Sequence, residues 1–297
     1  MKLSFEDKLL HCLIVLFLLF FAFINFYPFW NALIISFNLG TDTAQGGIAF
    51  WPRKFTLENY NVVFQDSRLI RAFGITITRT ILGTLLSMLF TGMFGYAMSK
   101  KHLIGKKLYM ILCVVTMYFG GGLIPSYLLI RELHLMNTIW VLIIPGIISV
   151  WNMIIFRTFF MGLPEGLEES ARIDGCNPFG IFFRIIVPVS GPVFATLSLF
   201  TAVLHWNDWF SASIYMNDNS LFPIQTLLNQ LINSNIMAEQ LQNAGGGASQ
   251  FAENLRGVTS RSLVMATMMV ATVPIMLVYP FLQKYFVKGV MVGSLKE

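Results

Sequence analysis

The side chains with the most capacity for chemistry gather in two short stretches and at one isolated position. Residues 162–188 include four carboxylates within ten positions, from Glu165 to Asp174. Residues 205–209 read His-Trp-Asn-Asp-Trp and combine aromatic rings with an amide and a carboxylate. Arg79 is the clearest charge inside a long apolar run. Such groups can bind a polar ligand or another protein.

Catalytic and metal-binding motifs are missing from the sequence. The four His are scattered, and neither HExxH nor GxSxG occurs. The three Cys are widely spaced, so a disulfide framework and a Cys-rich zinc site are both unsupported. A G-x-x-x-x-G-K-[ST] loop is also missing, because Gly105-Lys106 is followed by Lys107. We therefore expect no catalysis, no metal site and no ATP site on this chain.

Composition places most of the chain in a lipid bilayer. Of its 297 residues, 56% are hydrophobic and only 12% are charged, with a mean hydropathy of +0.67, whereas a soluble domain carries about 25% charge. A soluble enzyme and a disordered chain are both excluded. The net charge of +5 does not indicate nucleic-acid binding, because the basic residues flank apolar spans and are not interleaved with aromatic residues.

Six apolar segments are long enough to cross a membrane, which takes about 20 residues in a helix. Alternating strands of about ten residues are absent, so we predict an all-α, polytopic membrane protein with six transmembrane helices. No repeat or soluble domain is visible, and residues 1–297 are predicted to form a single transmembrane domain. The predicted helices cover residues 9–37, 72–98, 108–130, 138–161, 189–214 and 262–286.

The distribution of basic residues predicts the orientation. Four Lys lie between residues 100 and 107, and further Lys lie near both termini. Because short cytoplasmic loops are enriched in Lys and Arg, both termini are predicted to be cytoplasmic. Segment 162–188 then lies inside, and loop 215–261 lies outside. Basic residues of the first outer loop, such as Arg53, count against this orientation, but the loop is long enough to hold a small folded piece. The first segment is expected to be an uncleaved helix, because its apolar core is too long for a signal peptide.

Small residues recur at intervals of four along the second predicted helix. Small side chains let helices approach closely in lipid, so this row predicts a packing face. A wall of a translocation pathway is the less favoured interpretation. The row comprises Gly83, Ser87, Thr91, Gly95 and Ser99.

Local signals in segment 162–188 predict two short helices separated by a break. Pro164 suits the first position of a helix, and Gly175 suits its end. Asn177 can cap the second helix, and Pro188 is expected to bend the chain where it re-enters the membrane. Periodicity alone favours an amphipathic connector that covers the bundle.

Spacing within this segment adds a more specific interpretation, because it resembles the EAA loop of binding-protein-dependent ABC importer permeases. The family pattern is EAA, three residues, G, nine residues, I, one residue and L-P. Every spacing is kept here, with Ser in place of the first Ala and Val in place of Leu. The matching residues are Glu169-Ser170-Ala171, Gly175, Ile185 and Val187-Pro188.

The resemblance covers most of the chain, from about residue 72 to the end. It is closest to carbohydrate-importer permeases, the group of the second membrane subunit of maltose-type transporters, and within it to the polygalacturonan or rhamnogalacturonan permease branch. Other matching stretches are residues 116–130, 135–146, 156–160 and 205–210. The substrate branch is a looser inference than the family.

The resemblance implies an ABC type I importer permease fold and a non-catalytic subunit for import of oligosaccharides, including those with uronate units. It implies a bacterial cell-membrane protein that forms half of the pathway. The implied partners are a second homologous permease, two copies of a cytoplasmic ABC ATPase that bind ATP and Mg, and an extracellular or periplasmic sugar-binding protein. A heterodimeric pore is expected, and a homodimer stays open. The residues implied in ATPase coupling are Glu168, Glu169, Ser170, Ala171, Asp174, Gly175, Ile185 and Pro188.

Polar and aromatic residues within the spans are the candidates for a substrate pathway. Aromatic rings beside amides suit a sugar, whose apolar face stacks while its hydroxyls form hydrogen bonds, although an interfacial aromatic belt explains them equally well. Arg79 suits an acidic sugar, or it extends to the outer surface. The candidates are Arg79, Tyr118, Asn152, Trp206, Asn207, Asp208 and Trp209.

Two other function classes lack their expected chemistry. An ion-driven secondary sugar transporter, the main alternative, should show paired broken helices or a relay of carboxylates within the spans. Asp208 is the only plausible acid there. A membrane-embedded enzyme would need a catalytic constellation that the sequence does not contain.

Overall fold

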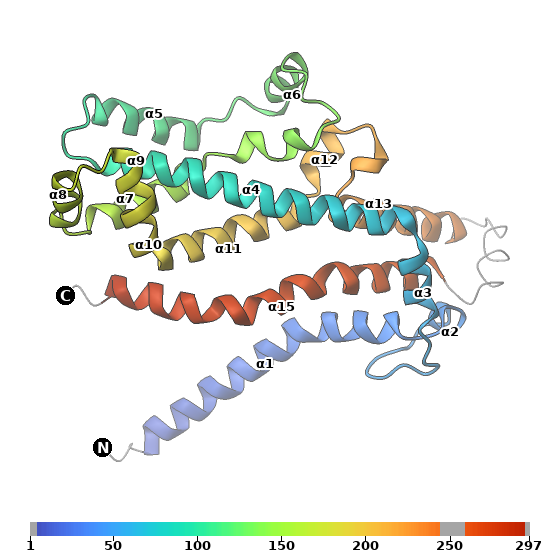
Figure 1. Ribbon diagram of the computed structural model, residues 1–297. Coiled ribbons are helices and arrows are strands. Elements are labelled where there is room, and N and C mark those ends of the chain that lie inside the picture. Colours follow the sequence, from blue (N-terminus) through green and yellow to red (C-terminus); the bar gives the residue numbers. More distant parts are fainter. Residues whose placement is uncertain (1–4, 244–258, 295–297) are drawn as a thin grey trace. The chain divides into compact units, whose positions relative to one another are not determined.

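Long helices dominate the computed structural model, which describes residues 5–243 and 259–294 (Figure 1). Within those residues the strand-type pairing is one isolated bridge between Asn38 and Phe55. The longest helices are α1 (Phe5–Ser36), α4 (Ser67–Ser99), α13 (Ile224–Asn243) and α15 (Ser260–Ser294). The shorter α-helices are α2 (Gly40–Ala44), α3 (Glu58–Gln65), α5 (Lys106–Tyr118), α6 (Leu123–Glu132), α7 (Val150–Met161), α8 (Gly166–Ile173), α9 (Pro178–Ile181), α10 (Val187–Val189), α11 (Gly191–Asn207) and α12 (Phe210–Tyr215).

Three helices are long and apolar enough to cross a membrane, or up to six if each bent pair counts as one span. The three long spans agree with the predicted segments 9–37, 72–98 and 262–286. Predicted segments 108–130 and 138–161 correspond to helix pairs bent by 111° and 47°, and segment 189–214 overlaps only the second helix, α11, of a pair bent by 84°. An all-α polytopic fold is therefore confirmed, but half of the spans are not continuous helices.

The third predicted span, 108–130, was wrong as one straight helix. α5 ends at Tyr118, α6 begins at Leu123, and the two are bent by 111°. Three consecutive glycines lie in the break, and Gly122 has a φ of +86°, which is the left-handed region. Glycine adopts such backbone at no steric cost, so the run ends the helix despite its apolar surroundings.

The fourth and fifth predicted spans are also interrupted. Segment 138–161 begins as two 3-10 turns, η1 (Ile139–Leu142) and η2 (Ile144–Gly146), before α7. Segment 189–214 contains α11 and α12, which are separated by Asp208 and Trp209. The polar stretch 205–209 was predicted to lie within a helix, but it lies where one helix ends.

The contacts of the described chain divide it into two compact units. The first holds the described residues up to Leu69 together with those of 228–273. The loop between α1 and α4 is a small folded piece, and the sequence analysis had found the loop long enough for one. There the Asn59 amide donates to the Ser36 and Asn38 carbonyls, and Arg53 pairs with Asp42 at 3.0 Å. That the two units act as one transmembrane domain stays a prediction.

The second unit holds residues 70–227 and those described after 273. α8, α9 and α10 gather near the carboxyl end of α4, and α12 lies toward its other end (Figure 1). Part of the small-residue row of α4 is a packing face, as predicted, whereas Ser87 of the same row lines a cavity. Phe156 of α7 approaches Gly95 so closely that an added Cβ would be 2.8 Å from its Cβ, and Thr91 accepts a hydrogen bond from the Ser149 amide at 3.2 Å.

Candidate functional site

Two short helices with a tight turn between them form the acidic segment, as the sequence predicts. α8 ends at Ile173, and Gly175 has a φ of +79°, which favours glycine. The Asn177 side chain then caps α9 by accepting from the Gly180 amide at 2.7 Å. Pro164 was wrongly placed, because it lies two residues before the first residue of α8.

The bend that follows α9 also differs from the prediction. The chain turns by 84° at Ser190, between the segment 178–189 and α11. Pro188 lies just before this point, in the short helix α10. A π-helical turn, η3 (Phe182–Ile186), connects α9 to α10, so α9 and the two segments after it run on with continuous helical backbone up to the bend.

The side chain of Ala171 packs α8 against the rest of the chain. Ala171 is 4% exposed and belongs to a core cluster with Tyr96 of α4, Phe156 of α7 and Phe182 of η3. Leu163 packs against the same cluster. The Ala171 side chain therefore holds α8 in place instead of facing outward, although the resemblance had placed it in a contact with the ATPase.

Ion pairs tie α8 to the end of α4. The Lys100 ammonium bonds both carboxylate oxygens of Glu168 and lies 3.7 Å from the centroid of the Tyr96 ring. Lys101 pairs with Glu165 at 2.5 Å. Burial lowers the pKa of Lys100, while the bond to Glu168 acts in the opposite direction. The hydrogen bond from Lys101 lowers the pKa of Glu165. Any displacement of α8 must therefore move or break contacts to α4.

The face of this segment that points away from the core cluster is exposed and accessible to another protein. Glu169, Ser170, Asp174 and Gly175 are all exposed. Ile173 is 86% exposed, a high value for a branched apolar side chain. Phe179 on α9 is also exposed, and our sequence analysis named neither residue. Both residues could have been found from the sequence, because each is an apolar residue close to the predicted turn between the two short helices. Of the remaining predicted residues, Ile185 packs against the core cluster and Pro188 is exposed.

The second cluster of predicted residues lies at the break between α11 and α12. Arg79 of α4 is 2% exposed, and its guanidinium bonds both the Asp208 carboxylate and the Asp208 carbonyl, the latter at 2.7 Å. The other carboxylate oxygen of Asp208 accepts from the Ser211 amide at 3.0 Å. Arg79 thus fixes the irregular backbone between the two helices and does not extend to the outer surface.

A cavity of about 1280 Å³ opens beside this ion pair. Four of the predicted pathway residues line it: Arg79, Asn152, Trp206 and Asp208. Asn152 donates to Thr201 at 3.2 Å, so α7 and α11 are joined in its wall. The lining also contains His205, Ser211 and Tyr215, which were not among the predicted pathway residues. Ser211 and Tyr215 belong to α12. The apolar pattern of the sequence did not show that α12 is a separate helix from α11.

Three predicted pathway residues do not line the cavity. Tyr118 lies at the end of α5 and is exposed, as are Asn207 and Trp209. The Trp209 carbonyl accepts a hydrogen bond from Thr226 at 3.1 Å. For these residues a part in the pathway stays a prediction without support from the cavity.

Three described residues of the cavity wall each carry a buried polar atom that lacks a hydrogen-bond partner. Within the described residues, Arg79 Nε, Thr80 Oγ1 and Ser87 Oγ are buried and have no hydrogen-bond partner. All three residues line the cavity. Buried polar groups without partners are costly, and a ligand that bonds them regains that free energy.

One close contact sets the width of the cavity near these groups. An added Cβ on Gly83 would lie 2.5 Å from Nε2 of His205, nearer than real Cβ atoms approach. His205 also lines the cavity, so a side chain at position 83 would displace its ring toward that space. Glycine at position 83 therefore lets α11 approach α4 where His205 lines the cavity.

Neither cluster has the composition of a metal centre. Across the described ranges, no group of three His, Cys, Asp or Glu is arranged to hold a metal ion. The two clusters are an exposed acidic surface near the carboxyl end of α4 and a largely apolar cavity that a few polar residues line.

Comparison with known proteins relates the chain to transport systems. The chain is 39% identical over 292 residues to the polygalacturonan/rhamnogalacturonan transport system permease protein YtcP of Bacillus subtilis, covering 98% of this chain and 99% of that one. It superposes with a TM-score of 0.87 and 26% identity on a chain of a bacterial ABC transporter involved in the import of the acidic polysaccharide alginate, covering 96% and 99% of the two chains. A further chain, from an alginate transporter in complex with a periplasmic protein bound to an alginate pentasaccharide, is 16% identical with a TM-score of 0.53 and shows the fold alone.

These likenesses confirm the importer permease fold, and they favour a transporter subunit over an enzyme. A model of one protein family matches residues 7–292, which is nearly the whole chain. The chain therefore belongs to the family of binding-protein-dependent transport system inner membrane components.

Proposed function

We propose that this chain is the permease subunit of an ATP-driven importer of oligosaccharides that contain acidic sugar units. It forms half of a translocation pathway and couples to a separate ATPase through α8. The observation that carries the proposal is that one compact unit holds both a large cavity, lined by Arg79 and Asp208, and the EAA segment of α8, whose Glu169 and Ser170 are exposed.

The acidic substrate class is supported by the cavity and by two relatives. Arg79 contributes a cation and an unpaired N–H to a wall that also holds Thr80 and Ser87 hydroxyls. A guanidinium recognises carboxylates, and hydroxyls bond sugar hydroxyls. Of the relatives described above, one is a polygalacturonan/rhamnogalacturonan permease and the other belongs to a transporter that imports the acidic polysaccharide alginate. We therefore assign a uronate-containing oligosaccharide.

Coupling through α8 is supported by its shape and attachments. A rigid helix with one exposed face can enter a cleft of an ATPase, and the partly buried ion pair between Glu168 and Lys100 passes its displacement to α4. ATP and Mg are bound by that ATPase. In this proposal α8, the 100–107 loop and both termini lie in the cytoplasm of a bacterial cell.

The complete importer comprises this chain, a second related permease, two ATPase copies and a sugar-binding protein outside the membrane. The family's description as binding-protein-dependent supports the last of these partners. A second permease is needed because the cavity is open on this chain alone. An ion-driven secondary carrier is the alternative that these partners would exclude.

Affinity purification in mild detergent tests the proposal. The tagged chain should copurify with an ATPase and a second permease, and the reconstituted complex should take up oligogalacturonate only with ATP and the binding protein. Uptake by the chain alone in liposomes under an ion gradient and without ATP would contradict it. Uptake of neutral but not acidic oligosaccharides would contradict the substrate class and leave the importer intact.

Exchange of the Lys100 and Glu168 charges tests the link between α8 and α4. We expect K100E and E168K each to lower ATP-dependent uptake at least about tenfold, because each leaves two like charges in a partly buried site. The double variant should regain much of the uptake, since the pair is restored in reverse. Exchange of the exposed Lys101 and Glu165 pair is the matched control and should change uptake less than about twofold. Equal defects at both pairs, or no recovery in the double variant, would contradict the link.

Substitution of Gly83 tests the cavity. G83A should reduce uptake several-fold, because the new methyl group must displace the His205 ring. G74A lies on the same helix with no atom within 4 Å of the added Cβ, and it should be near wild type. Initial uptake rates at equal amounts of assembled transporter measure the difference. Equal rates in the two variants would show that His205 adjusts freely and does not limit the pathway.

A further inference from the structure

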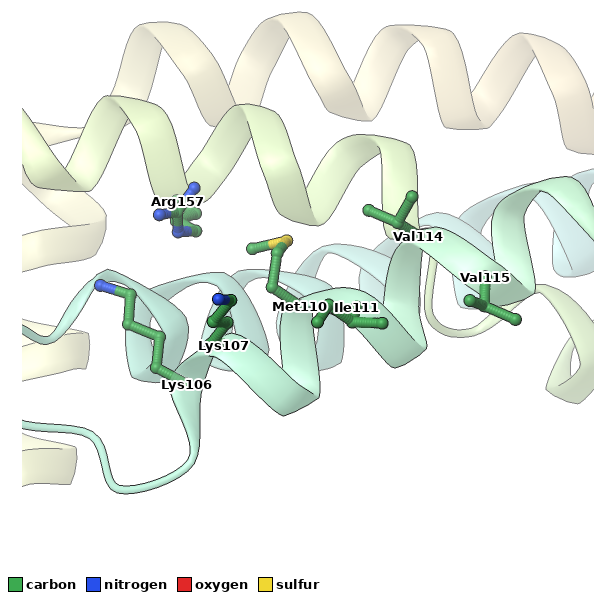
Figure 2. A pocket seen from close by; sticks show the side chains of 7 residues that line it. All are labelled: Lys106, Lys107, Met110, Ile111, Val114, Val115 and Arg157. Atoms are coloured by element: carbon green, nitrogen blue, oxygen red, sulfur yellow. The ribbon is translucent and has the colours of Figure 1, made fainter.

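A second hollow, remote from the cavity, lies between α5 and α7 (Figure 2). It has a volume of about 530 Å³, and we call it the basic groove. One end carries three cations and the other is apolar. Its lining comprises Lys106, Lys107, Arg157, Met110, Ile111, Val114 and Val115.

The cations of the basic groove are held at the end of α4. Lys106 donates to the Lys100 carbonyl at 3.1 Å, and Arg157 donates through Nε to the Met98 carbonyl at 3.3 Å. In the part of the chain that the structure describes, no carboxylate lines the groove. Among the described residues, none of its three cations forms a salt bridge. This end of the groove therefore has an excess of positive charge without a counterion.

The apolar part follows the membrane-spanning direction of α5. No residue of α5 is buried, and Figure 2 shows Met110, Val114 and Val115 succeeding the Lys residues along the helix. The charged end lies where α4 and α7 meet the connecting loops, and the apolar end runs into the span. That order of charge and hydrocarbon matches a membrane lipid with an anionic headgroup.

From this complementarity we infer that the basic groove binds an anionic phospholipid, with its phosphate among the three cations and an acyl chain along α5. A helix of the second permease is the competing occupant. An apolar helix would desolvate three cations without compensating them, which is costly in a membrane. A phosphate supplies charge-assisted hydrogen bonds to the same groups.

Native mass spectrometry of the intact transporter tests the site. The complex is titrated with dioleoyl-phosphatidylglycerol and, separately, with dioleoyl-phosphatidylethanolamine. We expect the wild type to retain the anionic lipid preferentially. K107Q should weaken its binding about fivefold, and K107Q with R157Q about tenfold or more, because each cation near the headgroups contributes about 1 kcal/mol. K101Q, a change of an exposed Lys outside the groove, is the matched control and should bind like wild type.

A photo-cross-linking amino acid in place of Ile111 provides a readout that does not depend on the charge variants folding normally. Capture of a phospholipid there supports the site. Capture of the second permease instead would overturn it, as would equal retention of the two lipids or an equal loss in K101Q.

Discussion

R79M should abolish uptake and lower the melting temperature of the assembled transporter. The substitution leaves Asp208 without its charge partner and releases the Asp208 carbonyl that Arg79 holds at 2.7 Å. Breaking a buried ion pair from one side costs about 3–5 kcal/mol, and the lower end applies here because Asp208 is partly exposed. Thermal unfolding in detergent and uptake in proteoliposomes measure the two effects.

A double variant separates the two roles of Arg79. D208N removes the carboxylate charge but keeps a side-chain oxygen for the Ser211 amide. R79M with D208N should therefore recover much of the melting temperature, because no unpaired charge remains. Uptake of acidic oligosaccharide should stay low, since the cation in the cavity wall is still missing. Recovery of both properties would show that Arg79 has only a structural role, and retention of the ATPase in every variant would confirm that the defect lies in the pathway.

Apolar composition predicted where the chain meets the membrane, but not the shape of each span. Segments 9–37 and 72–98 form the long helices α1 and α4, and α1 continues past Pro28 although proline removes one backbone donor there. The three glycines before Leu123 and the polar Asp208 break other spans that are just as apolar. Hydropathy averages over a window, so it cannot register a single residue whose backbone leaves the helix.

The sequence predicts site residues that act locally, and it does not predict contacts between residues far apart in the chain. Gly175 and Asn177 act through their own backbone and their near neighbours, and both behave as the sequence indicates. The pairing of Arg79 with Asp208 joins residues that are 129 positions apart, and no local pattern encodes it. Ala171 shows the opposite case, because a residue of the coupling motif packs inward once α8 meets the core cluster.

G175V should uncouple ATP hydrolysis from uptake while the protein still inserts and assembles. Its backbone is in the left-handed region at φ +79°, where a β-branched residue is strained by about 1–2 kcal/mol. The strain falls on the turn that sets the angle between α8 and α9. Uptake should be lost, whereas ATP hydrolysis should no longer depend on the binding protein. Normal uptake by G175V would contradict the coupling role of the segment.

G175N distinguishes backbone strain from surface contact. Asn tolerates the left-handed region far better than Val, and no atom of the described residues lies within 4 Å of a Cβ built at position 175. If the turn angle is what matters, G175N should retain most of the uptake that G175V loses. Both variants failing alike would mean that the ATPase fills the space beside Gly175 in the assembled importer. The described residues of this chain leave that space open to a side chain. The glycine would then be required for close approach of the two proteins, and α8 would still be the point of coupling.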